Sequence, residues 1–407
     1  MEISGTMPPM RRRAGTAARL VVAFAVALAA AGCGSGGDGD GDGDGGTPTR
    51  SAAVLEPACP APTAPPPQIS ADLINQRMAT SKLPAWQAAD IGASARLSDG
   101  RLVWVFGDTV RTSSFNPRIV ANSMLISSGD CVSQVRTPGD GPVIPDVSNG
   151  VVLWPMSVVV LPPVGEAAGT DVQDVLVVLC ARTQRGGSGG DLDFAFLGTS
   201  AAVFTVAGDG GVPQLQKVIE ITPDDSAKDQ VNWGAAATLH GDWYYAYGTR
   251  LPDEPGVFGR ELYVARAPVD DPGNQDKWRF WDGSHWGKAQ GDAVATLPAV
   301  GGVSQTLSVS HVDGQYVAVS KRDGDLGDFV YIWTAPTPAG PWTARQGVAA
   351  PSGVDTGELE YAPLAHPEVP LTDGRLLVSI SRNTTDFQQL MDDPEVGRPV
   401  FVEVERP

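Results

Sequence analysis

Two aspartates near the start of the folded part of the sequence have the spacing of a catalytic pair. Asp108 follows the apolar run 102–106 and stands between Gly107 and a threonine. The turn signal Asp99-Gly100 precedes this run, and Asp90 lies on the other side of the turn. A hairpin centred on Asp99 places the two aspartates directly opposite each other, whereas a two-residue loop shifts the register by one residue.

Two carboxylates in this arrangement predict acid–base chemistry. Opposed side chains in a hairpin have Cβ atoms about 4.5–5.5 Å apart, and like charges there destabilise a sheet. Burial and mutual repulsion raise the pKa of one member, so that it stays protonated. Glycoside hydrolysis uses such a pair, one carboxyl as general acid and the other as base or nucleophile. We predict that Asp90 and Asp108 are catalytic, that Asp108 has the more critical role, and that Gly107 leaves space for a sugar.

Other residues are predicted to bind the substrate or to compete for the catalytic role. Glu358 and Glu360 form an acidic pair and are the main rivals of the two aspartates. Trp154 and Trp233 are candidate platforms for sugar rings, although tryptophan in a strand-rich chain is more often a packing residue. A lone histidine is likewise more often structural than functional. The predicted substrate-binding residues are Trp154, Trp233, Arg250, Ser310, His311, Glu358, Tyr361, His366, Arg382 and Asn383.

The elements that must position these residues are short strands. From residue 83 onward the apolar runs are four to seven residues long, glycine and proline are abundant, and a helical period is almost absent. Five similar strands recur at spacings of about 73, 67, 73 and 60 residues, and four of them follow an Asp-Gly or Gly-Asp turn signal. These segments are 101–109, 174–183, 242–250, 315–323 and 375–383.

The recurrence predicts an all-β fold, a five-bladed β-propeller over residues 83–407. A double β-sandwich is the alternative, but each of the five strands ends in the same kind of polar cluster. Equivalent strand ends converge on one face of a propeller, where four units would supply a base and only the first an acid. We also predict that the strand near Val400–Val404 pairs with the first blade and closes the ring.

The N-terminal region is predicted to lie outside the propeller. Three arginines and an apolar run over 20–31 are typical of a signal peptide, because the run is too short to span a bilayer. Small residues lead into Cys33 as in a lipobox, so residues 1–32 are predicted to be cleaved and Cys33 lipidated. A plain secretory signal is the alternative. Residues 33–82 read as a Gly/Asp- and Pro-rich tether, which predicts an exported lipoprotein anchored at the cell envelope.

Composition narrows the possible partners. Removal of residues 1–32, with four Arg and one Glu, changes the net charge from −18 to −21, which argues against nucleic acid and suits a neutral polysaccharide. The membrane is expected to be contacted only through the lipid, and the chain to be a monomer. Cys59, Cys131 and Cys180 allow one disulfide and one free thiol, with the pairing left open. With four His and no Cys/His cluster, we expect no metal and no cofactor.

A series of short motifs runs through the folded part in order. They are Asp90-Ile91-Gly92, Phe106-Gly107-Asp108-Thr109, Tyr247-Gly248-Thr249, Glu261-Leu262-Tyr263-Val264-Ala265-Arg266, Tyr361-Ala362-Pro363, His366-Pro367-Glu368, Val378-Ser379-Ile380-Ser381-Arg382-Asn383 and Arg398-Pro399-Val400-Phe401. Over about residues 83–405 this series resembles a bacterial propeller family, long catalogued as a domain of unknown function, in which some members are assigned as endo-D-arabinanases. The resemblance implies hydrolysis of D-arabinofuranosyl linkages in envelope glycans, with the two early aspartates as the catalytic carboxylates.

Two classes of function follow from the sequence. The first is a tethered glycoside hydrolase that acts on an arabinan-type polysaccharide. The second is a non-catalytic propeller that binds glycan or protein at the cell envelope. Two carboxylates that face one cleft would support the enzyme, whereas carboxylates buried in ion pairs with Arg182 or Arg250 would support the binding protein.

Overall fold

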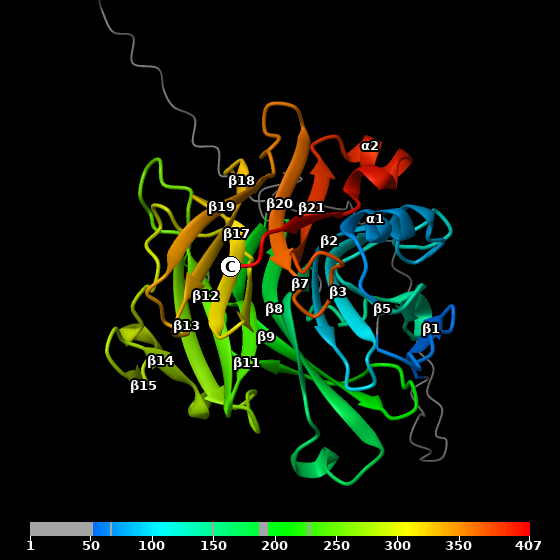
Figure 1. The fold of residues 1–407 in the computed structure, drawn as a ribbon, viewed down its shortest axis with the longest axis horizontal. Coiled ribbons are helices and arrows are strands. Elements are labelled where there is room, and N and C mark those ends of the chain that lie inside the picture. Colours follow the sequence, from blue (N-terminus) through cyan, green and yellow to red (C-terminus); the bar gives the residue numbers. More distant parts are fainter. Residues whose placement is uncertain (1–51, 66, 149, 187–193, 226, 228) are drawn as a thin grey trace, which may run out of the picture.

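A computed structural model describes residues 52–65, 67–148, 150–186, 194–225, 227 and 229–407. The predicted signal peptide, Cys33 and most of the Gly/Asp-rich tether lie outside these residues. The described chain forms five antiparallel sheets, which confirms the predicted five-bladed β-propeller. In Figure 1 the blades follow one another around the molecule in chain order, from cyan through green and yellow to red.

The first two blades contain the strands that carry the aspartates and their nearest neighbours. Blade 1 consists of β1 (Val54–Glu56), β2 (Ala88–Arg96), β3 (Leu102–Val110), β4 (Ile119–Val120), β5 (Ser123–Ser128) and β6 (Cys131–Arg136). Blade 2 consists of β7 (Val151–Leu161), β8 (Val172–Arg185), β9 (Phe194–Ala207) and β10 (Gln214–Glu220). A shared apolar core between these blades includes Val105, Ile126, Val158 and Val178.

The other three blades complete the ring. Blade 3 consists of β11 (Asn232–His240), β12 (Trp243–Arg250), β13 (Glu261–Pro268), β14 (Arg279–Trp281) and β15 (Trp286–Gly287). Blade 4 consists of β16 (Ser308–Val312), β17 (Gln315–Lys321), β18 (Phe329–Ala335) and β19 (Thr343–Ala349). Blade 5 consists of β20 (Glu358–Ala365), β21 (Leu376–Thr384) and β22 (Val400–Val404).

Helices are few and lie outside the sheets. The α-helix α1 (Ala71–Thr80) begins after Ser70, whose side chain accepts a hydrogen bond from Leu73 N, and α2 (Phe387–Asp392) begins after the capping residue Asp386. No helix in the described part of the chain is long and apolar enough to cross a membrane. The described residues also form five short 3₁₀ helices: η1 (Pro138–Asp140), η2 (Gly165–Ala167), η3 (Gln275–Lys277), η4 (Gln290–Asp292) and η5 (Pro394–Gly397).

The five recurring segments of the sequence are equivalent strands in the structure. They form β3, β8, β12, β17 and β21, each of which is hydrogen-bonded to the first long strand of its blade. These first strands, β2, β7, β11, β16 and β20, contact one another in a closed ring. The polar ends of the recurring strands therefore gather at one face of the molecule, as predicted.

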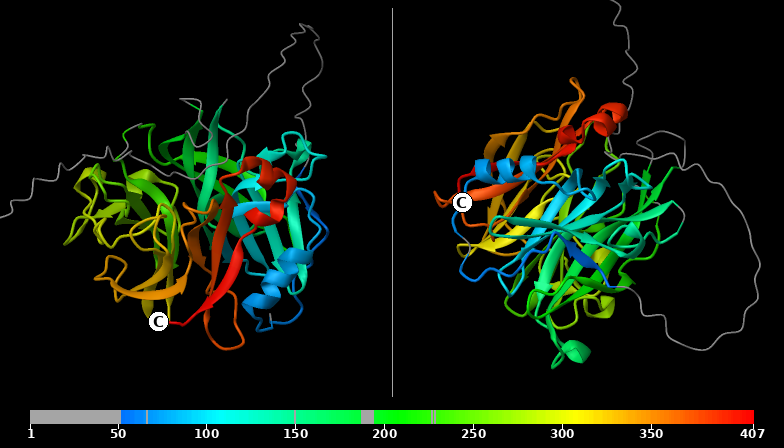
Figure 2. Two further views of the ribbon diagram at one scale, coloured as in Figure 1. Left: turned by 90° about the horizontal axis from the view of Figure 1, so that it is seen from above. Right: turned by 90° about the vertical axis from the view of Figure 1, so that its right-hand side faces the viewer.

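The ring closes differently from the prediction. β22 pairs with β21 of its own blade, from Leu376↔Val404 to Ile380↔Val400, and not with blade 1. Its other edge is met by α1, because the Asn75 side chain donates to Phe401 O and accepts from Phe401 N, both at 2.8 Å. An amide side chain thus satisfies edge groups that would otherwise need another strand. Figure 2 shows the blue helix beside the red C-terminal strand.

The folded domain also begins earlier than predicted. Residues 54–56, assigned to the tether, form β1 and pair with β6, and Cys59 is joined to Cys131 by a disulfide. The buried Ile74 and Met78 of α1 pack in a cluster with strands of blades 1 and 5. The third cysteine of the described chain, Cys180, is a buried free thiol. The N-terminal segment is therefore a strap across the joint between blades 5 and 1.

Candidate active site

The β2–β3 hairpin brings the two aspartates together through a bulge. Ala89↔Thr109 and Ser94↔Trp104 follow the predicted register centred on Asp99, which is confirmed on both sides of the site. Between Ala89↔Thr109 and Ile91↔Phe106, however, one residue of β2 faces two residues of β3. That one residue is Asp90. It lies against both Gly107 and Asp108, so the pair is close but not a simple cross-strand pair.

Gly107 is required by the neighbouring carboxylate. A Cβ atom built on Gly107 would lie 2.3 Å from Asp90 Oδ1, a separation that real Cβ atoms do not show. The space beside Gly107 is therefore filled by the Asp90 carboxylate. The prediction that Gly107 leaves this space for a sugar is wrong. Since any side chain here would displace the carboxylate, the glycine sets the position of Asp90.

The two carboxylates have different partners. Asp108 Oδ1 accepts a hydrogen bond from Trp154 Nε1 at 3.0 Å and forms an ion pair with Arg185. Asp90 Oδ2 accepts a hydrogen bond from the Tyr361 hydroxyl at 3.0 Å. Among the described residues, the buried Asp90 Oδ1 has no hydrogen-bond donor. Five strands of blades 1, 2 and 5 (β2, β3, β7, β8 and β20) thus carry the pair and its partners.

Burial raises the pKa of both carboxylates. The pKa of Asp90 rises to about 6, although the Tyr361 hydrogen bond and the Arg185 charge lower it in part. The pKa of Asp108 rises to about 7, against the lowering effect of Arg185 and with a further increase from the Asp90 charge. The two groups titrate as a pair. The pair therefore holds a proton at near-neutral pH, which is what a general acid requires.

Both carboxylates face a cavity of about 620 Å³ at the centre of the ring face. Bulges in β2, β7 and β20 turn residues of the innermost strands toward it. Ile91 (φ 68°) and Ala362 (φ 43°) have left-handed backbones, a strained conformation for residues with a side chain. The cavity is lined by Asp90, Ile91, Gly107, Asp108, Trp154, Pro155, Met156, Ala181, Gln305, Thr306, Asp325, Tyr361 and Ala362.

A second cavity, of about 290 Å³, also reaches both aspartates. Arg382 and Asn383 line it from β21, and Leu390 lines it from α2. Asn383 also forms a side-chain hydrogen bond with Tyr361. The carboxylate pair therefore lies where two cavities meet.

The structure brings several predicted residues to this site. Trp154 and Tyr361 contact the aspartates directly, and Arg382 and Asn383 line the second cavity. The Trp154 ring also lies 5.4 Å from the Arg185 guanidinium and 5.0 Å from the Phe194 ring. The Trp154 ring is thus positioned by contacts with Arg185 and Phe194, and its indole N–H donates a hydrogen bond to Asp108.

Other predicted substrate-binding residues lie elsewhere. Trp233 is fully buried between aromatic rings of blade 3, so it is a packing residue and has no face free for a sugar. His366 is also fully buried and contacts the hydroxyls of Ser94 and Ser379. It joins blade 5 to blade 1 and does not line the central cavity.

Ser310 and His311 lie toward the far end of β16, beside the β16–β17 turn. The His311 ring stacks on His240 at a centroid distance of 3.8 Å. Glu358 is exposed at the start of β20 and lines neither carboxylate cavity, and Arg250 forms an ion pair with Glu261. The structure therefore does not bring these four residues to the aspartates.

Most of the basic side chains at the strand ends form hydrogen bonds or ion pairs away from the aspartates. Arg182 is buried and donates to Thr222 O and Thr199 O, and Lys321 is buried and donates to Glu360 O. Neither contacts the aspartates. Both side chains donate instead to main-chain carbonyl groups, which need hydrogen-bond donors where a strand ends. The base that reaches Asp108 is Arg185, which lies two residues beyond Thr183, the last residue of the recurring segment 174–183.

Arg185 and Asp325 are site residues that sequence reasoning missed. Arg185 is an even number of residues beyond Ala181, which lines the cavity, so strand alternation places both on the same side of β8. Asp325 lies in the β17–β18 loop, in the Asp-rich stretch 323–328, and its sequence context resembles an ordinary turn. The described residues contain no group of three or more His, Cys, Asp or Glu arranged to hold a metal ion.

The family model described as "Domain of unknown function (DUF5005)" matches residues 75–406. The chain belongs to the DUF5005 family. This match covers the propeller from β2 to β22 and α1 from Asn75 onward, in agreement with a folded domain that begins before residue 83. The family description assigns no activity, so the arabinan-degrading activity implied by the motifs stays a prediction. No curated protein matches this DUF5005 chain in sequence.

Solved structures share the propeller fold with this DUF5005 protein. A Bacteroides ovatus ATCC 8483 protein, suggested to be a hydrolase, has a TM-score of 0.62 and 16% identity over 82% of this chain and 89% of that chain. At this identity the similarity shows the fold alone.

Two glycoside-degrading enzymes are more distant. A glycoside hydrolase family 43 arabinoxylan arabinofuranohydrolase from Bacillus subtilis has a TM-score of 0.47 and 12% identity, over 78% of this chain and 63% of that chain. An exo-β-1,3-galactanase from Phanerochaete chrysosporium has a TM-score of 0.43 and 12% identity, over 80% of this chain and 61% of that chain. The chain therefore spans less than two thirds of either enzyme, and neither similarity carries a functional argument.

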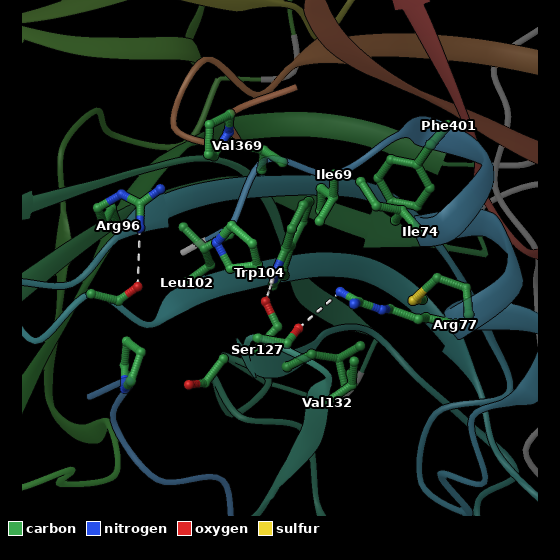
Figure 3. A pocket seen from close by; sticks show the side chains of 18 of the residues that line it. Ile69, Ile74, Arg77, Arg96, Leu102, Trp104, Ser127, Val132, Val369 and Phe401 are labelled. Carbon is green, nitrogen blue, oxygen red and sulfur yellow. Dashed lines mark hydrogen bonds between the residues drawn. The ribbon is translucent and has the colours of Figure 1, made fainter. Parts of the chain in front are cut away.

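An apolar cavity of about 870 Å³ lies under the N-terminal strap (Figure 3). Ile69 and Ile74 close it from the strap, while Trp104 and Phe401 line it from blades 1 and 5. The dashed lines in Figure 3 show that its polar groups already have partners, such as Trp104 Nε1 with Ser127 Oγ at 2.9 Å. Its residues are suited to packing and not to acid–base chemistry.

Proposed function

We propose that this DUF5005 protein is a glycoside hydrolase that uses Asp108 as a general acid. The observation that carries the proposal is a pair of buried carboxylates with raised pKa values that face one open cavity. A protonated carboxyl beside an ionised one is the arrangement by which glycosidases cleave sugar linkages. The fold-sharing Bacteroides ovatus protein, suggested to be a hydrolase, agrees with this proposal.

The substrate we propose is an arabinan-type polysaccharide with D-arabinofuranosyl linkages, cleaved internally. This choice rests on the motif resemblance, and the two cavities that meet at the aspartates support internal cleavage. The overall negative charge suits a neutral glycan better than a polyanion.

The test is to incubate the soluble propeller, residues 52–407, with a panel of envelope polysaccharides and to analyse the released oligosaccharides. The panel should include arabinan, galactan and xylan. We expect oligosaccharides of several lengths from the arabinan. A panel that yields no product from any polysaccharide would overturn the proposal, and product from another polymer would correct the substrate.

A non-catalytic glycan-binding propeller is the second candidate, and one observation favours it. Asp108 forms an ion pair with Arg185, although with neither of the arginines considered from sequence. A structural ion pair would leave no acid for catalysis. The raised pKa of Asp108 despite Arg185 favours the enzyme, because a purely structural pair would keep the carboxylate ionised.

We further propose that the protein acts at the outer face of the cytoplasmic membrane or cell envelope, as a monomer held by lipid on Cys33. The proposal is supported by the signal-peptide and lipobox pattern of the sequence. Cys33→Ser should release the protein from the membrane fraction into the soluble fraction. If the variant fractionates with the membrane as the wild type does, the lipoprotein assignment is wrong.

A further inference from the structure

A third carboxylate lines the central cavity. Asp325 belongs to the loop between β17 and β18 of blade 4 and lines the same cavity as Asp90 and Asp108. In the ring of innermost strands, blade 5 separates blade 4 from blade 1 on one side, and blades 2 and 3 separate them on the other. Asp325 and Asp108 therefore approach the cavity from different sides, whereas Asp90 and Asp108 come from one hairpin.

The loop that carries Asp325 is held by its backbone. Asp323 N donates to Gly302 O at 2.9 Å, and Gly327 N donates to Gly324 O at 3.0 Å. A Cβ atom on Gly324 would lie 2.2 Å from Phe258 O, so this residue packs directly against the loop of blade 3. Main-chain contacts thus set the position of Asp325 without using its side chain.

The carboxylate of Asp325 lies near Lys321 and Arg260 but forms an ion pair with neither of them. Lys321 is fully buried, and its Nζ donates to the main-chain oxygen of Asp325 at 3.4 Å. Burial lowers the pKa of Lys321 to about 8, and burial also lowers the pKa of Arg260; the Asp325 charge opposes both effects. Within the described chain, the Asp325 carboxylate has no hydrogen bond or ion pair. It is a charged group available to a molecule in the cavity.

We propose that Asp325, and not Asp90, is the general base of the hydrolysis; this inference rests on the proposed function. The Asp108 carboxyl gives its proton to the glycosidic oxygen while the bond from that oxygen to the anomeric carbon breaks, and the bonding electrons stay on the oxygen. A water molecule forms the new bond to the anomeric carbon, and the proton that it loses passes to Asp325. Proton exchange with solvent then restores both carboxyl groups.

The placement on different sides of the cavity also predicts the stereochemistry. An acid and a base that flank the bond, with a water between the base and the sugar, give inversion at the anomeric carbon. A base on the same hairpin as the acid would leave no such room for water, because Asp90 is already in contact with the Asp108 segment at Gly107.

The test compares Asp325→Asn and Asp325→Ala with Asp328→Asn, on the polysaccharide that the wild type cleaves. The control removes the same charge from the same loop, at an exposed residue that does not line the cavity. Loss of a general base should lower kcat by about 10²–10⁴-fold with a small change in KM. Sodium azide, which needs no base, should restore turnover of Asp325→Ala and give a glycosyl azide of inverted configuration. Asp328→Asn should keep the wild-type rate.

The outcomes separate the two proposals. A wild type that cleaves no polysaccharide overturns the hydrolase and this assignment together. A wild type that is active, with Asp325→Asn at the same rate or Asp325→Ala without azide rescue, overturns the base assignment alone. If Asp325→Ala does not fold, as judged by circular dichroism, the kcat of the nearly isosteric Asp325→Asn decides.

Discussion

Two cavities of the propeller differ in what surrounds them. The apolar cavity under the strap, about 870 Å³, is larger than the carboxylate cavity of about 620 Å³. Its walls are mainly apolar side chains from strands of blades 1 and 5, from α1 and from neighbouring loops. Its polar groups are hydrogen-bonded, as where Arg77 Nη1 donates to Gly129 O at 2.9 Å. The carboxylate cavity is walled by bulged strands and by loop residues that include Asp325. It holds Asp90 Oδ1, which has no donor among the described residues.

This difference shows that size alone does not identify a site of chemistry. Eleven buried side-chain atoms of the described residues lack a hydrogen-bond partner, and Asp90 Oδ1 is the one carboxylate oxygen among them. It also lies beside two residues with left-handed backbones, Ile91 and Ala362. The apolar cavity joins the strap to blades 5 and 1 and so contributes to stability. We expect substitutions at the carboxylate cavity to change activity and substitutions at the apolar cavity to change stability.

Asp108→Asn should have the largest effect. The amide still accepts a hydrogen bond from Trp154 but has no acid proton, so turnover should fall at least about 10²–10⁴-fold. Near pH 4, where the wild-type carboxyl is also protonated, thermal stability should be nearly unchanged, and glycan binding should be retained. The measurement is the rate of oligosaccharide release, with binding by calorimetry. A variant that cleaves polysaccharide as fast as the wild type would make Asp108 a structural residue.

Phe401→Ala tests the other cavity. Phe401 is buried and packs edge-to-face on Trp104 at a centroid distance of 5.9 Å. Its loss should lower the free energy of unfolding by about 3–5 kcal/mol, measured by urea denaturation, with kcat per folded molecule unchanged. Val218→Ala, at an exposed strand position, is the matched control and should cost less than about 0.5 kcal/mol. A large fall in kcat for Phe401→Ala would remove the distinction between the cavities.

The stability of the wild type relative to Asp108→Asn should depend on pH. The folded-state pKa of Asp108, about 7, is above its ordinary value of 3.8, so folding favours the protonated form. The stabilisation from this group is fully present below about pH 3.8 and is lost as pH rises through about 7. Denaturation curves from pH 4 to pH 8 should show the wild type losing stability relative to the variant. A constant difference over this range would contradict the raised pKa.

Arg185→Gln should have the smallest effect, a shift of the pH–rate profile. Because Arg185 lowers the pKa of Asp108, its removal should raise that pKa further. The alkaline limb of kcat/KM should then move to higher pH by on the order of one unit, while the maximal rate stays similar. An unchanged alkaline limb would mean that Asp108 does not titrate in catalysis.

The propeller could be predicted because its information is local. Each recurring strand is an apolar run with a turn signal before it, and the hairpin register around Asp99 follows from the period of two in a strand. The pairing of Asp90 with Asp108 was therefore within reach of the sequence, as were Trp154 and Tyr361. The N-terminal strap could not be predicted from the sequence, because the prolines and alanines before residue 70 are typical of a linker. Its role becomes visible only in the structure, where α1 covers the edge of β22.

The sequence by itself determined the five recurring strands, the register of the first hairpin on both sides of the site, and two of the three carboxylates in the cavity. Only the tertiary structure decided what meets across the cavity: that Arg185 and not Arg182 reaches Asp108, and that Asp325 arrives from blade 4. The physical reason is that contacts within a hairpin depend on neighbours in sequence. Contacts across the cavity depend on bulges and loop conformations, and these are set by packing between blades that are hundreds of residues apart.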